Sequence, residues 1–168
     1  MNFDCKTSDI TWRRTSSKEY FRERFQDEDW HRIFVDFKSD NDCSTYLTQY
    51  KDIVQSYTLY DNKTLQSIAF IWLILEEVNK HIISIHGGGW DKSVRLSFLY
   101  YRGLIVMIDH LLKQGFKVRT SCLIANERAF RFLRSVGFVK YYSTDTKHLM
   151  WINAKRLESS SIYKRIMQ

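Results

Sequence analysis

The sequence of 168 residues contains no proline, six glycines and three cysteines. The absence of proline excludes a proline-rich linker. The scattered positions of Cys5, Cys43 and Cys122 argue against a disulfide framework and against a CxxC metal site. The longest apolar run, Ile68 to Leu75, is far shorter than the ~20 residues that cross a membrane, and no apolar segment follows a basic start. We therefore expect a cytoplasmic protein with reduced thiols, no membrane contact and no bound metal.

Composition and length predict one compact domain. Hydrophobic residues make up 44% of the chain and aromatic residues 15%, so there is enough apolar surface to bury nearly throughout. A chain of this length can form one full core but is short for two. We expect a single domain over residues 1–168, with its core at about 10–157 and a C-terminal tail at 158–168.

Positive and negative charges are unevenly distributed along the chain. Residues 1–84 carry 11 Lys and Arg against 14 Asp and Glu, a net charge of −3, whereas residues 85–168 carry 15 against 5, a net charge of +10. This excess favours an anionic partner, either a nucleic acid or a phosphate-bearing cofactor, although a solvated basic surface has the same composition. The basic residues match no DNA-reading motif, which makes a nucleic-acid partner the weaker interpretation.

The spacing of apolar residues predicts an alternation of strands and helices. In chain order we expect a strand from residue 10, helices from residue 17 and within 36–50, three strands within 54–89, a helix within 91–114, a strand at 117–124, a helix at 126–136 and two strands within 137–157. The run Ile68 to Leu75 should be a strand buried on both faces. Gly115 should end its helix in the left-handed conformation. This order indicates an α+β domain with a mixed sheet.

The segment IHGGGW, Ile85 to Trp90, is compatible with an esterase oxyanion loop, a phosphate cradle or a flexible turn. An esterase also needs a GxSxG nucleophile elbow, and a nucleotide-binding loop needs GxxxxGK[ST] or GxGxxG; the sequence contains none of these. Two interpretations are left. Gly87 to Gly89 form either a mobile strand-to-helix loop or a backbone that approaches a ligand closely, because glycine has no Cβ.

The segment NERAFRFLRSVGF, Asn126 to Phe138, follows a predicted strand directly. Its asparagine, the alanine three residues later and the closing Gly-Phe resemble the C-terminal signature of the GNAT superfamily, the GCN5-related N-acetyltransferases. The element order is similar to that fold from about Ile10 to Leu157. The resemblance implies an acyl-CoA N-acyltransferase fold, in which helices flank a mixed, mostly antiparallel sheet of about six to seven strands. The same motif together with the glycine run also resembles divergent GNAT-like proteins of tailed phages and prophages.

The resemblance implies acetyl-CoA as cofactor and a place for it. In GNAT proteins acyl-CoA inserts where the fourth and fifth strands part, which correspond to HIISIH and KVRTSCLI here. The backbone of Ser84, Ile85 and His86 would then contact the pantetheine arm and the thioester. The asparagine of the C-terminal signature, Asn126, would bond the cofactor, cap the helix that it opens, or do both.

The resemblance also implies that the N-terminus of the helix after the glycine run receives the pyrophosphate. The family pattern [QR]xxGx[GA] is matched here only at Arg95, because Phe98 and Tyr100 occupy the glycine positions. Arg95 and Arg102 would replace the missing contacts by charge-assisted hydrogen bonds to phosphate. Solvated arginines on a helix are the alternative interpretation.

The tyrosine that many GNAT members carry seven residues after the asparagine is replaced by Leu133. Tyr141 or Tyr142 could supply a proton instead, although aromatic residues in a strand usually pack. Histidine is mostly neutral at pH 7, so His86 is the first candidate for the base that deprotonates an amine. Glu76 and Glu77 come next, and we select Glu77 with His86 as the catalytic pair.

Two functions are compatible with these features. The first is an acyl-CoA-dependent N-acyltransferase, which transfers acetyl from acetyl-CoA to a primary amine of a small molecule or a protein. The second is a catalytically degenerate GNAT-fold protein that binds CoA, a nucleic acid or a protein through its basic half. We expect a monomer or a dimer in either case.

Overall fold

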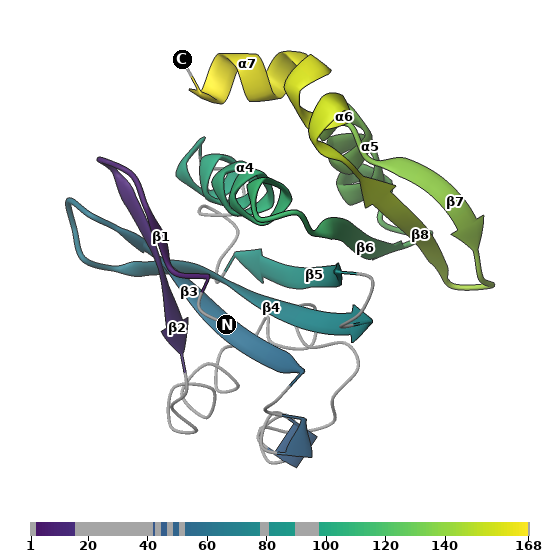
Figure 1. Cartoon of the computed structure of the whole chain (residues 1–168), viewed down its shortest axis with the longest axis horizontal. Coiled ribbons are helices and arrows are strands. Elements are labelled where there is room, and N and C mark those ends of the chain that lie inside the picture. Colours follow the sequence, from purple (N-terminus) through teal and green to yellow (C-terminus); the bar gives the residue numbers. More distant parts are fainter. Residues whose placement is uncertain are drawn as a thin grey trace. The chain divides into compact units, whose positions relative to one another are not determined.

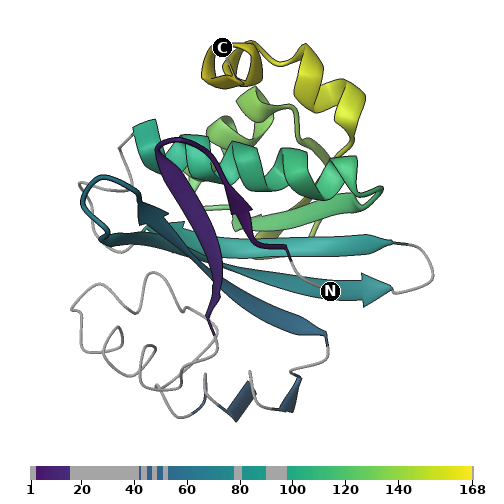
Figure 2. The same ribbon diagram turned by 60° about the vertical axis from the view of Figure 1, so that its left-hand side comes forward.

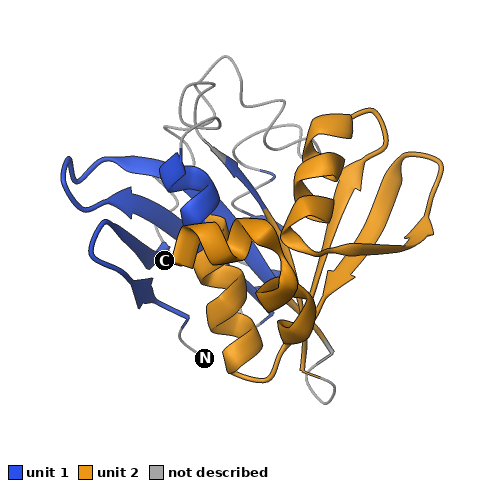
Figure 3. Cartoon of the chain, turned by 90° about the horizontal axis from the view of Figure 1, so that it is seen from above, with its two compact units in different colours: residues 1–74, 87–103 blue, residues 75–86, 104–168 orange. Residues whose placement is uncertain are grey.

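The computed structural model describes residues 3–15, 42, 45–46, 49–50, 53–77, 81–89 and 98–167. The chain divides into two compact units, shown in Figure 3. Unit 1 contains Met1–Ile74 and Gly87–Gly103, and unit 2 contains Leu75–His86 and Leu104–Gln168. Our expectation of one domain stays a prediction.

Eight strands form one sheet in the order β1-β2-β3-β4-β5-β6-β8-β7 (Figure 1), one strand more than the upper limit we expected. Their bounds are β1 (Cys5–Lys6), β2 (Ile10–Thr15), β3 (Val54–Asp61), β4 (Ser67–Glu77), β5 (Ile82–Gly89), β6 (Lys117–Leu123), β7 (Val139–Ser143) and β8 (Lys147–Ile152). The helices whose bounds the structure describes are α4 (Phe98–Lys113), α5 (Glu127–Val136), α6 (Ala154–Ser159) and α7 (Ser161–Met167). Within the predicted helix at 36–50, the described residues 42, 45, 46 and 49 are helical. The predicted helix near residue 17 lies outside the described residues.

Unit 1 contains an antiparallel arrangement in which β2 pairs with β1 and β3, and β3 pairs with β4. The indole of Trp12 on β2 is fully buried, and its Nε1 donates to the carbonyl oxygen of Gly103 at 2.8 Å. The apolar run that we expected to be buried on both faces is buried from Ile68 to Leu73. Its last two residues are only half-buried. The prediction of a buried central strand is therefore confirmed for most of β4.

In unit 2, the strands β5, β6, β8 and β7 are neighbours in the sheet. β5 pairs with β6 in parallel, and β8 lies between β6 and β7 and is antiparallel to both. The β7–β8 hairpin closes through a polar turn in which the Thr144 N–H donates to the carbonyl oxygen of Lys147 at 2.9 Å. The register between these strands shifts at Lys140/Tyr142, where β7 is irregular. The two C-terminal strands were thus predicted correctly.

Helix α5 has the two end signals that the sequence predicts. The side chain of Asn126 accepts a hydrogen bond from the Ala129 N–H at 3.1 Å and caps the N-terminus. Gly137 adopts φ 115° and ends the helix in the left-handed conformation. Helix α4 is followed by Gly115, which adopts φ 86°. Its residues Ile105 to Ile108 are buried.

Residues 158–168, which we expected to form a tail, belong to the end of α6 and to α7 as far as Met167. Ile166 is buried, and the hydroxyl of Tyr163 donates to Asp109 Oδ1 on α4 at 3.0 Å. Figure 2 shows α5, α6 and α7 gathered together within unit 2. Residues 161–167 therefore form a packed helix, in which Ile162, Tyr163 and Ile166 recur at helical spacing.

The two described thiols are expected to react slowly with alkylating reagents. Burial, with a smaller contribution from Asp4, raises the pKa of Cys5 to about 12, and burial also raises the pKa of Cys122. A thiol in the unfolded chain has a pKa of ~8.5. Because the pKa of Cys5 is higher in the folded protein, its protonated thiol adds to the free energy of unfolding below pH ~8.5, and this contribution is lost as the pH rises towards 12. At pH 8 we expect iodoacetamide to label Cys5 more than about 100-fold more slowly in the folded protein than in urea. Equal rates, measured by peptide mass spectrometry, would contradict the described environment of Cys5.

Candidate functional site

The strands β5 and β6 of unit 2 are paired over only three residues. The pairs are Ile82 with Lys117, Ile83 with Val118 and Ser84 with Arg119. β6 continues to pair with β8 on its other side as far as Leu123. Among the described residues of unit 2, Ile85 and His86 have no ladder partner on β6. The strands therefore part after the Ser84–Arg119 pair, as the GNAT resemblance implies.

One hydrogen bond spans the strands immediately beyond the last pair. The hydroxyl of Thr120 on β6 donates to the carbonyl oxygen of Ile85 on β5 at 2.9 Å. A side chain thus takes the position of the next ladder bond, which keeps the two backbones further apart than a backbone-to-backbone bond would. The first backbone acceptor in the opening is already engaged.

The two faces of the parting strands differ in chemistry because side chains alternate along a strand. On one face, Ile83, Ile85 and Val118 are buried. On the opposite face, His86 and Arg119 are half-buried polar residues that follow the alternation of Ser84. We call this second face the polar face. It carries His86 and Arg119 next to the point where the strands part.

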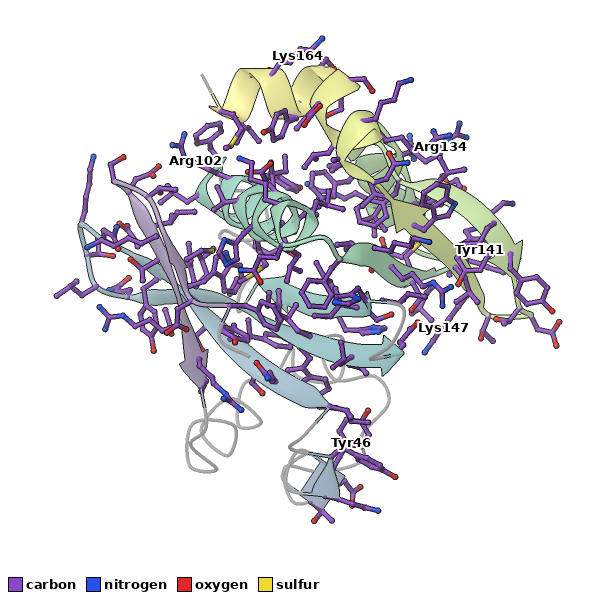
Figure 4. The ribbon with its side chains drawn as sticks, in the orientation of Figure 1. Tyr46, Arg102, Arg134, Tyr141, Lys147 and Lys164 are labelled. Atoms are coloured by element: carbon purple, nitrogen blue, oxygen red, sulfur yellow. The ribbon has the colours of Figure 1, made fainter. Side chains whose placement is uncertain are left out.

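A carboxylate joins three strands on the polar face. Glu76 on β4 accepts a hydrogen bond at Oε1 from the hydroxyl of Ser84 on β5 and pairs through Oε2 with Nη1 of Arg119 on β6 at 2.9 Å. The guanidinium of Arg119 also lies 5.7 Å from the ring centre of Tyr141 on β7. Figure 4 shows Tyr141 on the β7–β8 hairpin, together with Lys147. We call Glu76, Ser84 and Arg119 the Glu76 bridge.

Ser84 is a site residue that the sequence predicts, whereas Arg119 is not. The alternation of KVRTSCLI places Arg119 on the side opposite Val118, but nothing local indicates a partner 43 residues earlier in the chain. Glu76 was considered as a base after His86. In the structure both of its oxygens accept hydrogen bonds.

The predicted catalytic pair is only partly described. His86 is half-buried on β5, two residues beyond Ser84 and directly after the residue at which the strands part. Glu77 is the last residue of β4, and its side chain lies outside the described residues. The role of both residues stays a prediction.

The predicted cofactor contacts Arg95, Arg102 and Asn126 differ in how far the structure describes them. Arg95 lies outside the described residues. Arg102 on α4 is labelled in Figure 4. In unit 1, its Nε forms an ion pair with Oδ2 of Asp9 at 3.2 Å, so a phosphate would have to compete with this carboxylate. Asn126 uses its Oδ1 as a helix cap, which leaves the amide nitrogen for any contact with a cofactor.

The glycine run is the end of a strand and not a loop. Gly87 to Gly89 are the last residues of β5. In unit 1, a Cβ on Gly87 would overlap the carbonyl oxygen of Phe70 and lie 2.9 Å from Cα of Ile71. The close backbone approach that we considered for a ligand is therefore made to the protein's own strand β4.

The tyrosine substitutes suggested by the sequence are at the surface of β7. Tyr141 is 50% exposed and Tyr142 59% exposed, whereas Leu133 on α5 is half-buried. The ring of Tyr141 packs against Arg119, as an aromatic residue of a strand usually packs against its neighbours.

Of the residues that the structure describes, no group of three or more His, Cys, Asp or Glu could hold a metal ion. No described helix is long and apolar enough to span a membrane.

Comparison with solved structures identifies the fold. No family model matches the sequence, and no curated protein matches it. A mutant of spermidine N-acetyltransferase SpeG from Vibrio cholerae has a TM-score of 0.71 at 11% identity, over 91% of this chain and 98% of that one. The same enzyme in complex with CoA and spermine has a TM-score of 0.67 at 12% identity, over 91% and 100%. A probable GNAT-family acetyltransferase from Chromobacterium violaceum has a TM-score of 0.76 at 10% identity, over 95% and 90%.

These likenesses show that the chain has the GNAT acetyltransferase fold, as the resemblance of Asn126 to Phe138 implied. The mixed, mostly antiparallel α+β architecture is confirmed, with eight strands in place of six to seven.

Proposed function

We propose that the protein is an acetyl-CoA-dependent N-acetyltransferase that transfers an acetyl group to a primary amine. The observation that supports this most directly is the parting of β5 and β6 after three pairs, within a chain of GNAT fold. A structural neighbour of the same fold was solved with CoA and spermine, which supports CoA as the cofactor and an amine as the acceptor.

The residues around the parting point fit an acyl-CoA. Beyond the Ser84–Arg119 pair, β5 presents backbone amides that no ladder bond from β6 occupies in the described part of unit 2. Peptide N–H and C=O groups are the natural partners for the amides of a pantetheine arm. When bound, acetyl-CoA supplies an activated acyl thioester. The contribution of Ser84, Ile85 and His86 would be to hold and orient it through their backbones.

The chain's own acid–base chemistry depends on the polar face. A protonated amine must lose a proton before it can attack, and a positioned base contributes roughly 10²- to 10⁴-fold. His86 is the candidate because it follows the parting point directly and has an imidazole on the polar face. Glu77 is the second candidate, and water can relay the proton to either residue.

A thermal unfolding assay with acetyl-CoA tests the cofactor. A ligand at ~100 times its dissociation constant stabilises the folded state by about 2.7 kcal/mol, which corresponds to a rise in Tm of roughly 5 to 11 °C for a chain of this size. We expect this rise with acetyl-CoA and a smaller one with the analogue that lacks the 3′-phosphate. Arg95→Ala should also reduce it.

Transfer is tested by measuring amine-dependent release of CoA with a thiol reagent. The acceptor amines to be compared in this assay are small-molecule polyamines, amino-acid amides and lysine peptides. Absence of any Tm change at millimolar acetyl-CoA would exclude the proposed cofactor. A Tm change without CoA release from any acceptor would instead favour the binding module.

A second candidate, the non-catalytic binding module, is supported by the surface of α5, α6 and α7. These helices carry seven exposed cations: Arg128, Arg131, Arg134, Lys155, Arg156, Lys164 and Arg165. Two of them, Arg134 and Lys164, are labelled in Figure 4. The exposed carboxylates of these helices are Glu127 and Glu158, and the first pairs with Arg131 at 3.0 Å. This candidate predicts oligonucleotide binding that weakens steeply with salt.

A further inference from the structure

We propose that Glu76 is a positioning residue, which fixes the point at which β5 and β6 part and thereby sets the place of the acyl group relative to His86. This inference rests on the proposed transferase function. It concerns unit 2 alone, in which Glu76, Ser84 and Arg119 come from three different strands. It also assigns a role to the bridge that is different from that of a base.

The position of the bridge is the first argument. Ser84 and Arg119 form the last pair of the parallel ladder, and Glu76 binds the side chains of both. Paired residues of neighbouring strands have their side chains on the same face, so one carboxylate can reach both. A contact at any earlier pair would leave the end of the ladder free to fray. The bridge is located at the pair where fraying would begin.

The chemistry of the three groups is the second argument. Ser84 is 4% exposed, and a buried hydroxyl needs a hydrogen-bond partner, which the carboxylate of Glu76 provides. Arg119 donates to the other carboxylate oxygen, so both bonds are charge-assisted. Because the side chains of Glu76 and Arg119 are 33% and 35% exposed, the pair is only partly screened by water. The bridge is thus less exposed to water than the Arg131–Glu127 pair, whose side chains are 76% and 77% exposed.

The orientation of Arg119 is the third argument. Its guanidinium lies 5.7 Å from the ring centre of Tyr141, which limits the rotation of the arginine side chain. A guanidinium is planar and its donors have fixed directions, so a restrained arginine holds Glu76 in one place. β6 is itself held by its antiparallel pairing with β8. The bridge thus ties β5 to a strand that is fixed on its other side.

The consequence for catalysis follows from the alternation of side chains. His86 is two residues after Ser84 and lies on the same face of β5. Thr120, the residue after Arg119, binds the carbonyl oxygen of Ile85 and begins the opening. If the Ser84–Arg119 pair opened, the parting point would retreat towards Ile82, and the backbone of Ile85 and His86 would lose its fixed position. A misplacement of about 1 Å at reacting groups can reduce a rate by about 10²-fold.

Hydrogen–deuterium exchange of the free protein tests the bridge without any cofactor. Glu76→Ala should raise the exchange rate of the amides in residues 82–86 and 117–121 by about 10-fold or more, because opening of the last pair is no longer opposed. The amides of residues 147–152 on β8 should be unchanged. Glu127→Ala is the matched control, since it removes an ion pair of similar length, 3.0 Å, whose side chains are 76% and 77% exposed.

Steady-state kinetics test the consequence. Glu76→Gln retains the shape of the side chain but loses its charge, and we expect kcat/KM to fall by about 10- to 10²-fold, mainly through kcat. Glu76→Asp and Ser84→Ala should give intermediate values, and Glu127→Gln should equal the natural sequence. A stability defect alone would lower Tm in proportion and leave kcat of the remaining folded protein unchanged.

The outcomes separate this inference from the proposed function. If acetyl-CoA neither binds nor is turned over by the natural sequence, the transferase proposal is wrong, and the exchange experiment still decides whether the bridge holds the strands. If the natural sequence is active, Glu76→Ala matches Glu127→Ala in exchange, and Glu76→Gln matches Glu127→Gln in kcat, the bridge is not a positioning device. If Glu76→Ala does not fold, Glu76→Gln and Ser84→Ala decide the question.

Discussion

Replacement of Gly87 by alanine is expected to destabilise the protein by about 3 kcal/mol or more. The new methyl group would overlap the carbonyl oxygen of Phe70 and crowd Cα of Ile71, which are both backbone atoms of β4. These two residues are paired with Thr58 and Tyr57 on β3, so β4 cannot retreat without breaking its own ladder. Urea unfolding followed by circular dichroism measures the effect as a lower midpoint.

Two other glycines are the controls for this prediction. A Cβ on Gly103 would overlap a terminal methyl group of Leu59, which can rotate away, so Gly103→Ala should cost less than Gly87→Ala. Gly115 has nothing within 4 Å of such a Cβ, but its φ of 86° is unfavourable for alanine, and we expect a cost of about 1 kcal/mol. If Gly87→Ala were as stable as Gly115→Ala, the close approach to β4 would not exist.

Replacement of His86 by glutamine is expected to lower kcat by roughly 10²- to 10⁴-fold. Glutamine can still form hydrogen bonds but cannot accept a proton from an ammonium group near neutral pH. The backbone of β5 is unchanged by the substitution, so the rise in Tm with acetyl-CoA should be the same as for the natural sequence. Steady-state rates with a saturating amine, together with the thermal assay, separate the two effects.

His110→Gln is the matched control. His110 lies on α4, where its Nε2 is 2.8 Å from Nε2 of Gln114, and its replacement should leave kcat within about twofold. The competing base is Glu77, so Glu77→Gln belongs in the same series. A large loss for Glu77→Gln with none for His86→Gln would transfer the role of base to Glu77.

The parts of the fold that local chemistry determines were predicted from the sequence. An asparagine cap and a glycine stop are set by contacts within a few residues, and both ends of α5 are where Asn126 and Gly137 place them. The run Ile68 to Leu75 is apolar at every position, which favours a strand covered on both sides, and its residues Ile68 to Leu73 are buried. The C-terminal hairpin follows from β-rich runs around a polar turn.

Features that depend on distant parts of the chain were not predicted. Glu76 and Arg119 are 43 residues apart, and Asp9 and Arg102 are 93 apart, so their pairing follows from the fold and not from local patterns. The prediction that Arg102 binds phosphate was made without knowledge of Asp9. For the glycine run a loop and a close approach to a ligand both stay open, because sequence alone does not show which backbone comes close to Gly87. The strand β1 has only two residues, too few for a period to be visible.

The irregular register of β7 at Lys140/Tyr142 has a consequence for the solubility of the protein. Among the strands that the structure describes, β7 is the outermost and has β8 as its neighbour, and the edge of such a strand can recruit a strand of another molecule. An irregularity of this kind twists the strand and interrupts the regular row of such groups. The register shift lies at Tyr141, whose ring contacts Arg119. The same shift therefore also opposes edge-to-edge aggregation through β7.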